Sequence, residues 1–69
     1  MNKKKNIGNN LQKYRVWKGL LQADFANQTG ISISEVRLIE QNKVSPNPRT
    51  TTTILKYFDV SYDQMFYAK

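Results

Sequence analysis

The sequence predicts a small all-α domain built from five helices, and three observations predict it. Apolar residues recur at helical spacing, polar residues stand at several expected helix starts, and glycines follow two helical segments. A chain of 69 residues has room for one domain. We therefore expect a domain over residues 7–69, preceded by a flexible basic arm over residues 1–6.

The first two helices are predicted from apolar spacing and from glycine. The first should span residues 7–18 and end at Gly19, because glycine readily adopts the left-handed conformation that ends many helices. The second should span residues 22–28 and end before Gly30. The apolar positions of these two helices are Ile7, Leu11, Tyr14, Phe25 and Ala26.

A capping box predicts the third helix over residues 33–40. Ser32 is followed three residues later by Glu35, so the serine oxygen should accept the Glu35 N–H while the glutamate reaches back to the backbone of Ser32. Val36 and Ile39 then face inward.

Two further N-terminal signals predict the last helices. Asn47 precedes Pro48, which is an N-cap followed by a proline at the first helical position. Four threonines at 50–53 weaken the helix propensity of this segment, but Ile54, Leu55 and Phe58 supply apolar anchors. Ser61 with Gln64 repeats the capping box and should open a short helix that runs through Phe66.

The second and third helices carry the spacing of a helix-turn-helix. Two helices that cross through a short turn need a small residue at their contact, a residue that tolerates positive φ in the turn, and apolar residues that brace the second helix. Ala26, Gly30, Val36 and Ile39 meet these needs in order. The sequence therefore predicts a helix-turn-helix that begins at Gln22.

On these residues the chain resembles the Cro/cI-type helix-turn-helix family, also called XRE-type or lambda-repressor-like regulators, from Ile7 to Phe66. The resemblance implies a five-helix domain whose second and third helices bind double-stranded DNA. It also implies a cytoplasmic homodimer that represses transcription from a palindromic operator with half-sites about 34 Å apart. Further matching residues are Gly8, Leu11, Arg15, Gly19, Leu20, Phe25, Ser34, Glu40, Lys43, Pro46, Thr50, Val60 and Ser61.

The chain departs from the family pattern at three places. Leu21 stands where a serine or threonine cap for the second helix is usual, and Pro48 and Thr51 stand where leucines are common. Ile33 and Leu38 are apolar where polar, base-reading side chains are frequent. These two residues either contact thymine methyl groups or pack against the protein or a protein partner.

The net charge of +6 favours a polyanionic partner. The resemblance places Gln22 against a phosphate at the start of the second helix. Ser34 and Arg37 are the polar residues of the third helix best suited to contact DNA. The lysines of the N-terminal arm either bind phosphates or form a solvated tail. The complete predicted set is Gln22, Ser32, Ile33, Ser34, Arg37, Leu38, Asn42 and Lys43, with Lys3, Lys4 and Lys5 of the arm.

Two structural roles complete the expectations. By resemblance, Arg15 and Glu40 form a partly buried ion pair between the first helix and the end of the third. The C-terminal segment is more apolar than a monomer of this size needs, which suggests a dimer contact. Its residues are Tyr62, Met65, Phe66 and Tyr67.

Several functions are disfavoured by composition. The chain has no cysteine and no histidine, few carboxylates and no glycine-rich phosphate loop, so we expect no enzyme, no metal site and no cofactor. No apolar stretch approaches a membrane span, and no small-molecule ligand is expected. The alternatives to a regulator are a module of the same fold that binds a partner protein, including an antitoxin, and nonspecific attachment to nucleic acid or acidic membranes through charge.

Overall fold

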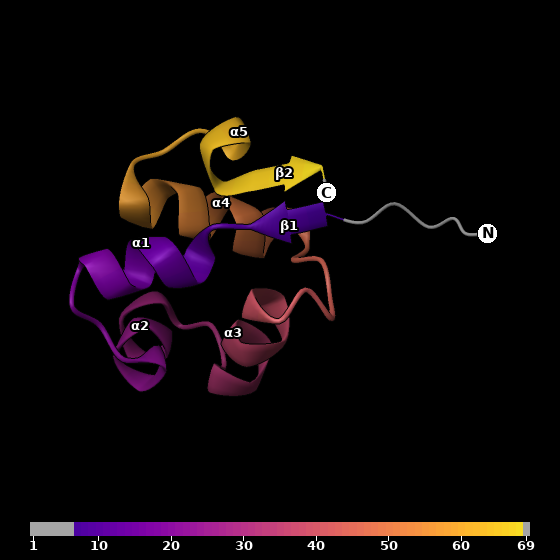
Figure 1. Ribbon diagram of the computed structural model, residues 1–69. Coiled ribbons are helices and arrows are strands. Elements are labelled where there is room, and N and C mark those ends of the chain that lie inside the picture. The colour runs from indigo at the N-terminus through magenta and orange to yellow at the C-terminus, as the bar shows by residue number, and fades with distance from the viewer. Residues whose placement is uncertain (1–6, 69) are drawn as a thin grey trace.

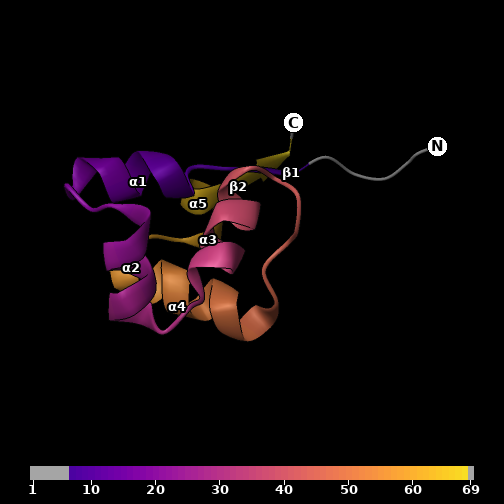
Figure 2. The same ribbon diagram turned by 90° about the horizontal axis from the view of Figure 1, so that it is seen from below.

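The computed structural model describes residues 7–68 and confirms a mostly helical domain with five helices within that range. The predicted arm, residues 1–6, lies outside the described residues. The elements in chain order are β1 (Ile7–Asn9), α1 (Leu11–Trp17), α2 (Gln22–Thr29), α3 (Ile33–Glu40), α4 (Pro48–Phe58), α5 (Tyr62–Met65) and β2 (Phe66–Ala68). In Figure 1, α2 and α3 occupy one side of the fold, and α5 with β2 occupies the opposite side. Figure 2 views the fold from the side of α2 and α3, with α5 and β2 fainter behind them.

The main correction to the predicted elements concerns the two ends of the domain. Residues 7–9 do not extend the first helix but form β1, which pairs antiparallel with β2 so that Gly8 lies opposite Tyr67 (Figure 1). The last helix accordingly ends at Met65, and Phe66 belongs to β2 rather than to the helix. A β-carbon at position 8 would collide with the aromatic ring of Tyr67, so a larger residue there would require the exposed Tyr67 ring to move.

The first helix starts late because neighbouring polar groups hold the chain before it in place. The Oδ1 of Asn9 accepts the backbone N–H of Leu11 at 2.9 Å. The backbone N–H of Asn10 donates to the Met65 carbonyl at 2.8 Å, and the Asn10 amide nitrogen donates to the Gln64 carbonyl at 3.0 Å. These bonds join the segment before α1 to the end of α5, and helical hydrogen bonding begins only after them.

The predicted N-terminal signals are present, with one correction. Ser32 Oγ accepts the Glu35 N–H at 3.1 Å, and Ser61 forms a reciprocal box with Gln64. Glu35 does not reach back to complete its own box, because its Oε2 lies 3.5 Å from the hydroxyl of Thr50 on α4. The Asn47 side chain caps α4 through a 2.8 Å bond to the Thr50 N–H.

The hydrophobic core lies between the helices and under the small sheet. Phe25 stacks on Phe58 with ring centroids 5.4 Å apart, which joins α2 to α4. The two predicted helix-ending glycines, Gly19 and Gly30, have φ values of +73° and +80°. The buried apolar residues are Leu11, Phe25, Ala26, Ile31, Val36, Ile39, Ile54, Met65 and Phe66.

Candidate nucleic-acid interface

The turn between α2 and α3 is built from the residues whose spacing predicted it. Gly30 ends α2 in the left-handed conformation, and its N–H donates to the Ala26 carbonyl at 2.9 Å. Ala26 is buried where α2 meets α3, and Val36 and Ile39 on the inner face of α3 are buried as well. The core therefore fixes the orientation of α3 relative to α2.

The opposite face of α3 is directed away from the core. At about 100° per residue, Ser34 lies opposite the buried pair Val36 and Ile39, with Arg37 and Leu38 on either side of it. Ser34 and Arg37 are exposed, Leu38 is 38% exposed, and Ile33 at the edge of this surface is half-buried. We call Ile33, Ser34, Arg37 and Leu38 the outer surface of α3.

The acidic side chains of α3 lie away from its outer surface. Glu35 is half-buried beside Thr50, and the Glu40 side chain is 5% exposed and paired with Arg15. The outer surface therefore carries the positive charge of Arg37 without a carboxylate among its members. Such a surface is electrostatically compatible with a phosphate polyanion.

A network around Glu40 connects α3 to α1 and α2. Arg15 donates from Nε to Glu40 Oε2 at 2.7 Å and from Nη2 to Oε1 at 3.2 Å, and its Nη1 donates to the Leu20 carbonyl at 2.7 Å. Gln22 Nε2 donates to Glu40 Oε1 at 3.0 Å. The structure thus brings together the predicted pair of Arg15 and Glu40 and adds Gln22 to it.

The network adds a structural role for Gln22 to the sequence-based expectation of a phosphate contact. One N–H of its side-chain amide donates to Glu40, and the amide carries a second N–H donor besides. The first backbone N–H groups of α2 have no acceptor within the helix, as at every helix N-terminus. The same first turn holds the Asp24 carboxylate, which accepts the Leu21 N–H at 3.1 Å.

The segment after α3 presents two of the predicted residues at the surface. Asn42 adopts a left-handed conformation with φ of +61°, and Lys43 is exposed beside it. Ser32 is exposed at the start of α3, near the outer surface. Lys3, Lys4 and Lys5 lie outside the described residues.

Sequence reasoning missed Asn9. Its amide nitrogen donates to the Ile39 carbonyl at 2.8 Å and to Asn42 Oδ1 at 2.8 Å, while its Oδ1 accepts the Leu11 N–H. One side chain therefore joins β1, the start of α1 and the C-terminal end of α3. An asparagine just before a helix was the available signal, but its contacts with α3 depend on tertiary structure.

We expect Asn9→Ala to lower the free energy of unfolding by about 1–3 kcal/mol, because it leaves the partly buried Leu11 N–H without its acceptor and removes one of the two donors to the Ile39 carbonyl, which keeps the Asn42 N–H. For a domain of this size that corresponds to a melting-temperature decrease of roughly 4–8 °C per kcal/mol. Asn9→Asp is the comparison variant: it keeps the acceptor for Leu11 but replaces the amide donor with a charged oxygen that faces the Ile39 carbonyl and Asn42 Oδ1. Thermal melts of both variants check this, and an unchanged melting temperature for Asn9→Ala would contradict it.

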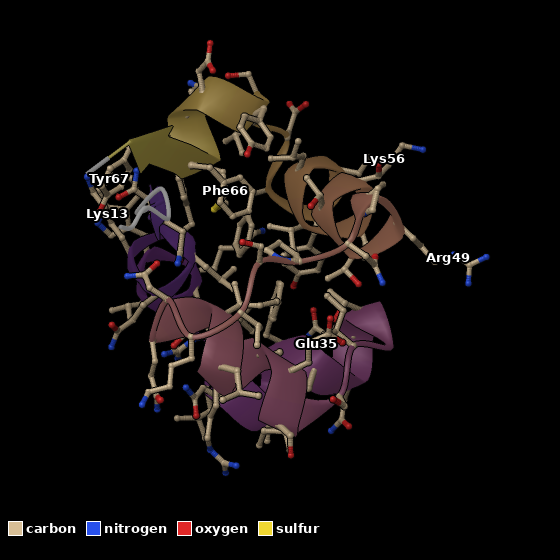
Figure 3. The ribbon with its side chains drawn as sticks, turned by 90° about the vertical axis from the view of Figure 1, so that its right-hand side faces the viewer. Lys13, Glu35, Arg49, Lys56, Phe66 and Tyr67 are labelled. Atoms are coloured by element: carbon tan, nitrogen blue, oxygen red, sulfur yellow. The ribbon has the colours of Figure 1, made fainter. Side chains whose placement is uncertain are left out.

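The predicted dimer contact is wrong for two of its four residues. Met65 is 0% exposed and Phe66 is 5% exposed, so their side chains fill the core of the monomer and offer no surface to a second copy. Figure 3 shows Phe66 pointing into the interior, between the C-terminal elements and α4. Tyr62 and Tyr67 keep 53% and 45% of their surface exposed.

Between residues 7 and 68, no helix is long and apolar enough to cross a membrane. The same part of the chain contains no group of three or more His, Cys, Asp or Glu side chains that could hold a metal ion.

The core braces α3, a left-handed glycine turn precedes it, and its outer surface is free of carboxylates. Together these features define a helix-turn-helix domain. Comparison with known proteins agrees. A family model described as helix-turn-helix matches residues 11–65, and the chain belongs to this family, in its XRE-type branch. It is also 33% identical over 58 residues to an uncharacterised HTH-type transcriptional regulator of Methanocaldococcus jannaschii, an alignment that covers 84% of this chain and 88% of that protein. No solved structure matches the chain significantly.

Proposed function

We propose that the protein is a sequence-specific transcriptional regulator, a repressor of the cytoplasm, that binds a palindromic operator in double-stranded DNA as a homodimer. One observation carries the proposal: the outer surface of α3 combines exposed Ser34 and Arg37 with no carboxylate, on a helix that the core holds rigidly against α2. A helix of this kind fits the major groove, where arginine and serine can contact base edges. Bound there, the domain acts by occupying the DNA, which favours repression.

The neighbouring elements supply contacts that carry no base information. The N-terminus of α2 presents backbone N–H groups and a positive dipole end to a phosphate. Asn42 and Lys43 after α3 extend the contact along the backbone, and Lys3, Lys4 and Lys5 add charge to it. These groups set the register of α3 in the groove rather than the sequence it selects.

The homodimer places one α3 on each half-site of the operator. Two-fold symmetric proteins of this class match half-sites about one helical turn, roughly 34 Å, apart. The exposed rings of Tyr62 and Tyr67 belong to α5 and β2, which lie on the opposite side of the fold from α2 and α3 (Figure 1). A contact that uses these rings leaves the outer surface of α3 uncovered.

Binding of a partner protein is the second candidate function. Val16, Trp17 and Leu21 are 57%, 70% and 70% exposed near the end of α1 and the start of α2. Exposed apolar side chains of this size are typical of protein contacts when they form a continuous patch. This candidate predicts tight binding to another protein without selection among DNA sequences.

Selection of bound duplexes from a random DNA pool at near-physiological salt tests the proposal. An enriched palindrome supports a dimeric, sequence-specific regulator. Enrichment of one isolated half-site would overturn the homodimer, and binding without enrichment would overturn sequence specificity. The enriched site is then placed over a reporter promoter. Lower transcription in the presence of the protein supports repression, whereas increased transcription would contradict repression.

We expect Lys43→Ala to reduce the slope of log affinity against log salt by about 0.9, since each lysine that neutralises a phosphate releases about that much counterion. Lys56→Ala is the matched control, because Figure 3 shows Lys56 extending from α4 into solvent. Titrations of the selected duplex at several salt concentrations measure both slopes. Equal slopes for the two variants would remove Lys43 from the interface.

A further inference from the structure

The outer surface of α3 contains two apolar side chains that the proposed function leaves without a role. Leu38 is 38% exposed. Around the helix axis, Ser34 lies between Leu38 and Arg37. Ile33 is half-buried at the first position of the helix. Both lie on the face that a helix-turn-helix presents to the bases, so their chemistry bears on which base pairs are accepted.

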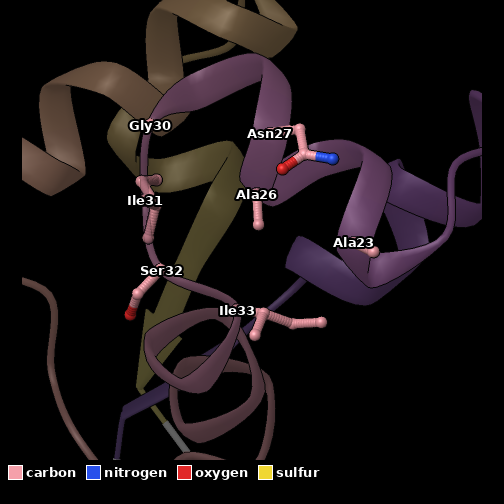
Figure 4. Close-up of a pocket in the computed structure, with 7 residues that line it drawn as sticks. All are labelled: Ala23, Ala26, Asn27, Gly30, Ile31, Ser32 and Ile33. Atoms are coloured by element: carbon pink, nitrogen blue, oxygen red, sulfur yellow. The ribbon is translucent and has the colours of Figure 1, made fainter.

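Ile33 belongs to a larger apolar surface. A hollow of about 400 Å³ lies between α2 and the start of α3, and Figure 4 shows Ala23, Ala26 and Ile33 facing the same space within it. Its lining also includes Asn27, Gly30, Ile31 and Ser32. A group placed against Ile33 therefore meets methyl groups from both helices.

The chemistry of the major groove points to one occupant for such a surface. Thymine presents a C5 methyl group there, whereas cytosine presents an amino donor and adenine and guanine present polar edges. A polar edge against Ile33 or Leu38 would lose water without gaining a hydrogen bond, which is unfavourable. Burial of a thymine methyl group against these side chains is favourable, because it removes apolar surface from water.

Resting on the proposed function, we propose that Ile33 and Leu38 select thymine by contact with its methyl group, so that each half-site carries two thymines that these side chains read. Five residues at 1.5 Å each separate the two side chains by about 7.5 Å along the helix axis. With base pairs 3.4 Å apart, the two thymines lie about two base pairs from each other. Ser34 and Arg37 read the polar edges beside them.

Replacement of thymine by uracil tests the inference directly, because uracil keeps every hydrogen-bonding group and lacks only the methyl. The probe is the duplex enriched from the random pool, synthesised with a single uracil at each thymine in turn. We expect about fourfold weaker binding at two positions of each half-site, the factor given by burial of one methyl group, and no change elsewhere. Equal affinity for every uracil duplex, or a selected site without thymine, would overturn the inference.

Variants of the two residues assign each methyl group to its reader. In Leu38→Ser, the penalty for uracil should vanish at one position and persist at the other, and Ile33→Ser should show the converse. Val16→Ser, which removes an exposed apolar side chain of α1, should keep both penalties. Leu38→Ser carries the test if Ile33→Ser fails to fold, because Leu38 is more exposed.

If both variants lost affinity for the thymine and uracil duplexes by the same factor, the penalty for uracil would persist. The two side chains would then have a structural role only, and the inference would be overturned. A protein that enriches no sequence at all would instead refute the proposed function. A protein that enriches a site, yet reads thymine and uracil equally, would leave the proposed function intact and refute the role of the methyl groups.

Discussion

Glu40→Ala is expected to lower the free energy of unfolding by about 3–5 kcal/mol, because it leaves the Arg15 guanidinium buried without its counter-charge. The Arg15 side chain is 9% exposed and donates two hydrogen bonds to this carboxylate. Gln22 loses the acceptor of its amide as well. A domain of this size has a total stability of roughly 3–10 kcal/mol, so the variant should be largely unfolded at moderate urea concentrations.

Urea unfolding followed by circular dichroism measures this effect. Asp63→Ala serves as the control for loss of a carboxylate, since Asp63 is exposed on α5. The double variant Arg15→Met/Glu40→Met should be more stable than Glu40→Ala, because it removes both charges and leaves neither one unpaired. If the free energy of unfolding of Glu40→Ala lay within about 0.5 kcal/mol of that of the original protein, the network would have no structural importance.

Arg37→Ala is expected to weaken binding to the selected operator by about 10- to 100-fold, with loss of selection at one base pair of each half-site. Arginine donates to two acceptors of guanine at once, and such a contact is worth about 1–3 kcal/mol of discrimination. Arg37 is exposed, so its truncation should leave the melting temperature close to that of the original protein.

Arg49→Ala is the matched control, because Figure 3 shows Arg49 extending from α4 into solvent, away from the ribbon of α3. It removes the same charge from the protein and should change affinity only slightly. Repetition of the random-pool selection with each variant reveals which base pair depends on Arg37. An unchanged selected sequence and affinity for Arg37→Ala would show that this side chain does not read DNA.

The helical part of the fold could be predicted because its signals are local. Ser32, Asn47 and Ser61 cap helices through backbone groups three residues away, and Gly30 needs only its own positive φ. The composition and spacing of the turn between α2 and α3 likewise lie within a few residues. Each of these features therefore appears in the sequence itself.

The β1–β2 pair could not be predicted in this way because its partners are distant in sequence. Residues 7–9 continue the apolar spacing of α1, and only the pairing of Gly8 with Tyr67 makes them a strand. Asn9 is similar, since its bonds to Ile39 and Asn42 exist only once α3 is folded. Propensity alone cannot weigh such tertiary contacts.

The candidate site was predicted in part for the same reason. The polar character of Ser34 and Arg37 predicted that these residues of the third helix face outward, and both are exposed in the structure. The sequence did not reveal that the Gln22 amide donates to Glu40. Nor could an apolar C-terminus show whether Met65 fills the core of its own chain or that of a partner, because both uses require the same residue types.

Selection of a DNA sequence by the outer surface of α3 can be measured as a ratio of two affinities. We would measure binding of the original protein and of Ser34→Ala/Arg37→Ala to the selected duplex and to a scrambled duplex of equal length at one salt concentration. We expect the original protein to prefer the selected duplex by a factor of at least about 10³, and the variant to lose most of this preference with little change in its affinity for the scrambled duplex. A variant that kept the full preference would show that Ser34 and Arg37 do not select the sequence.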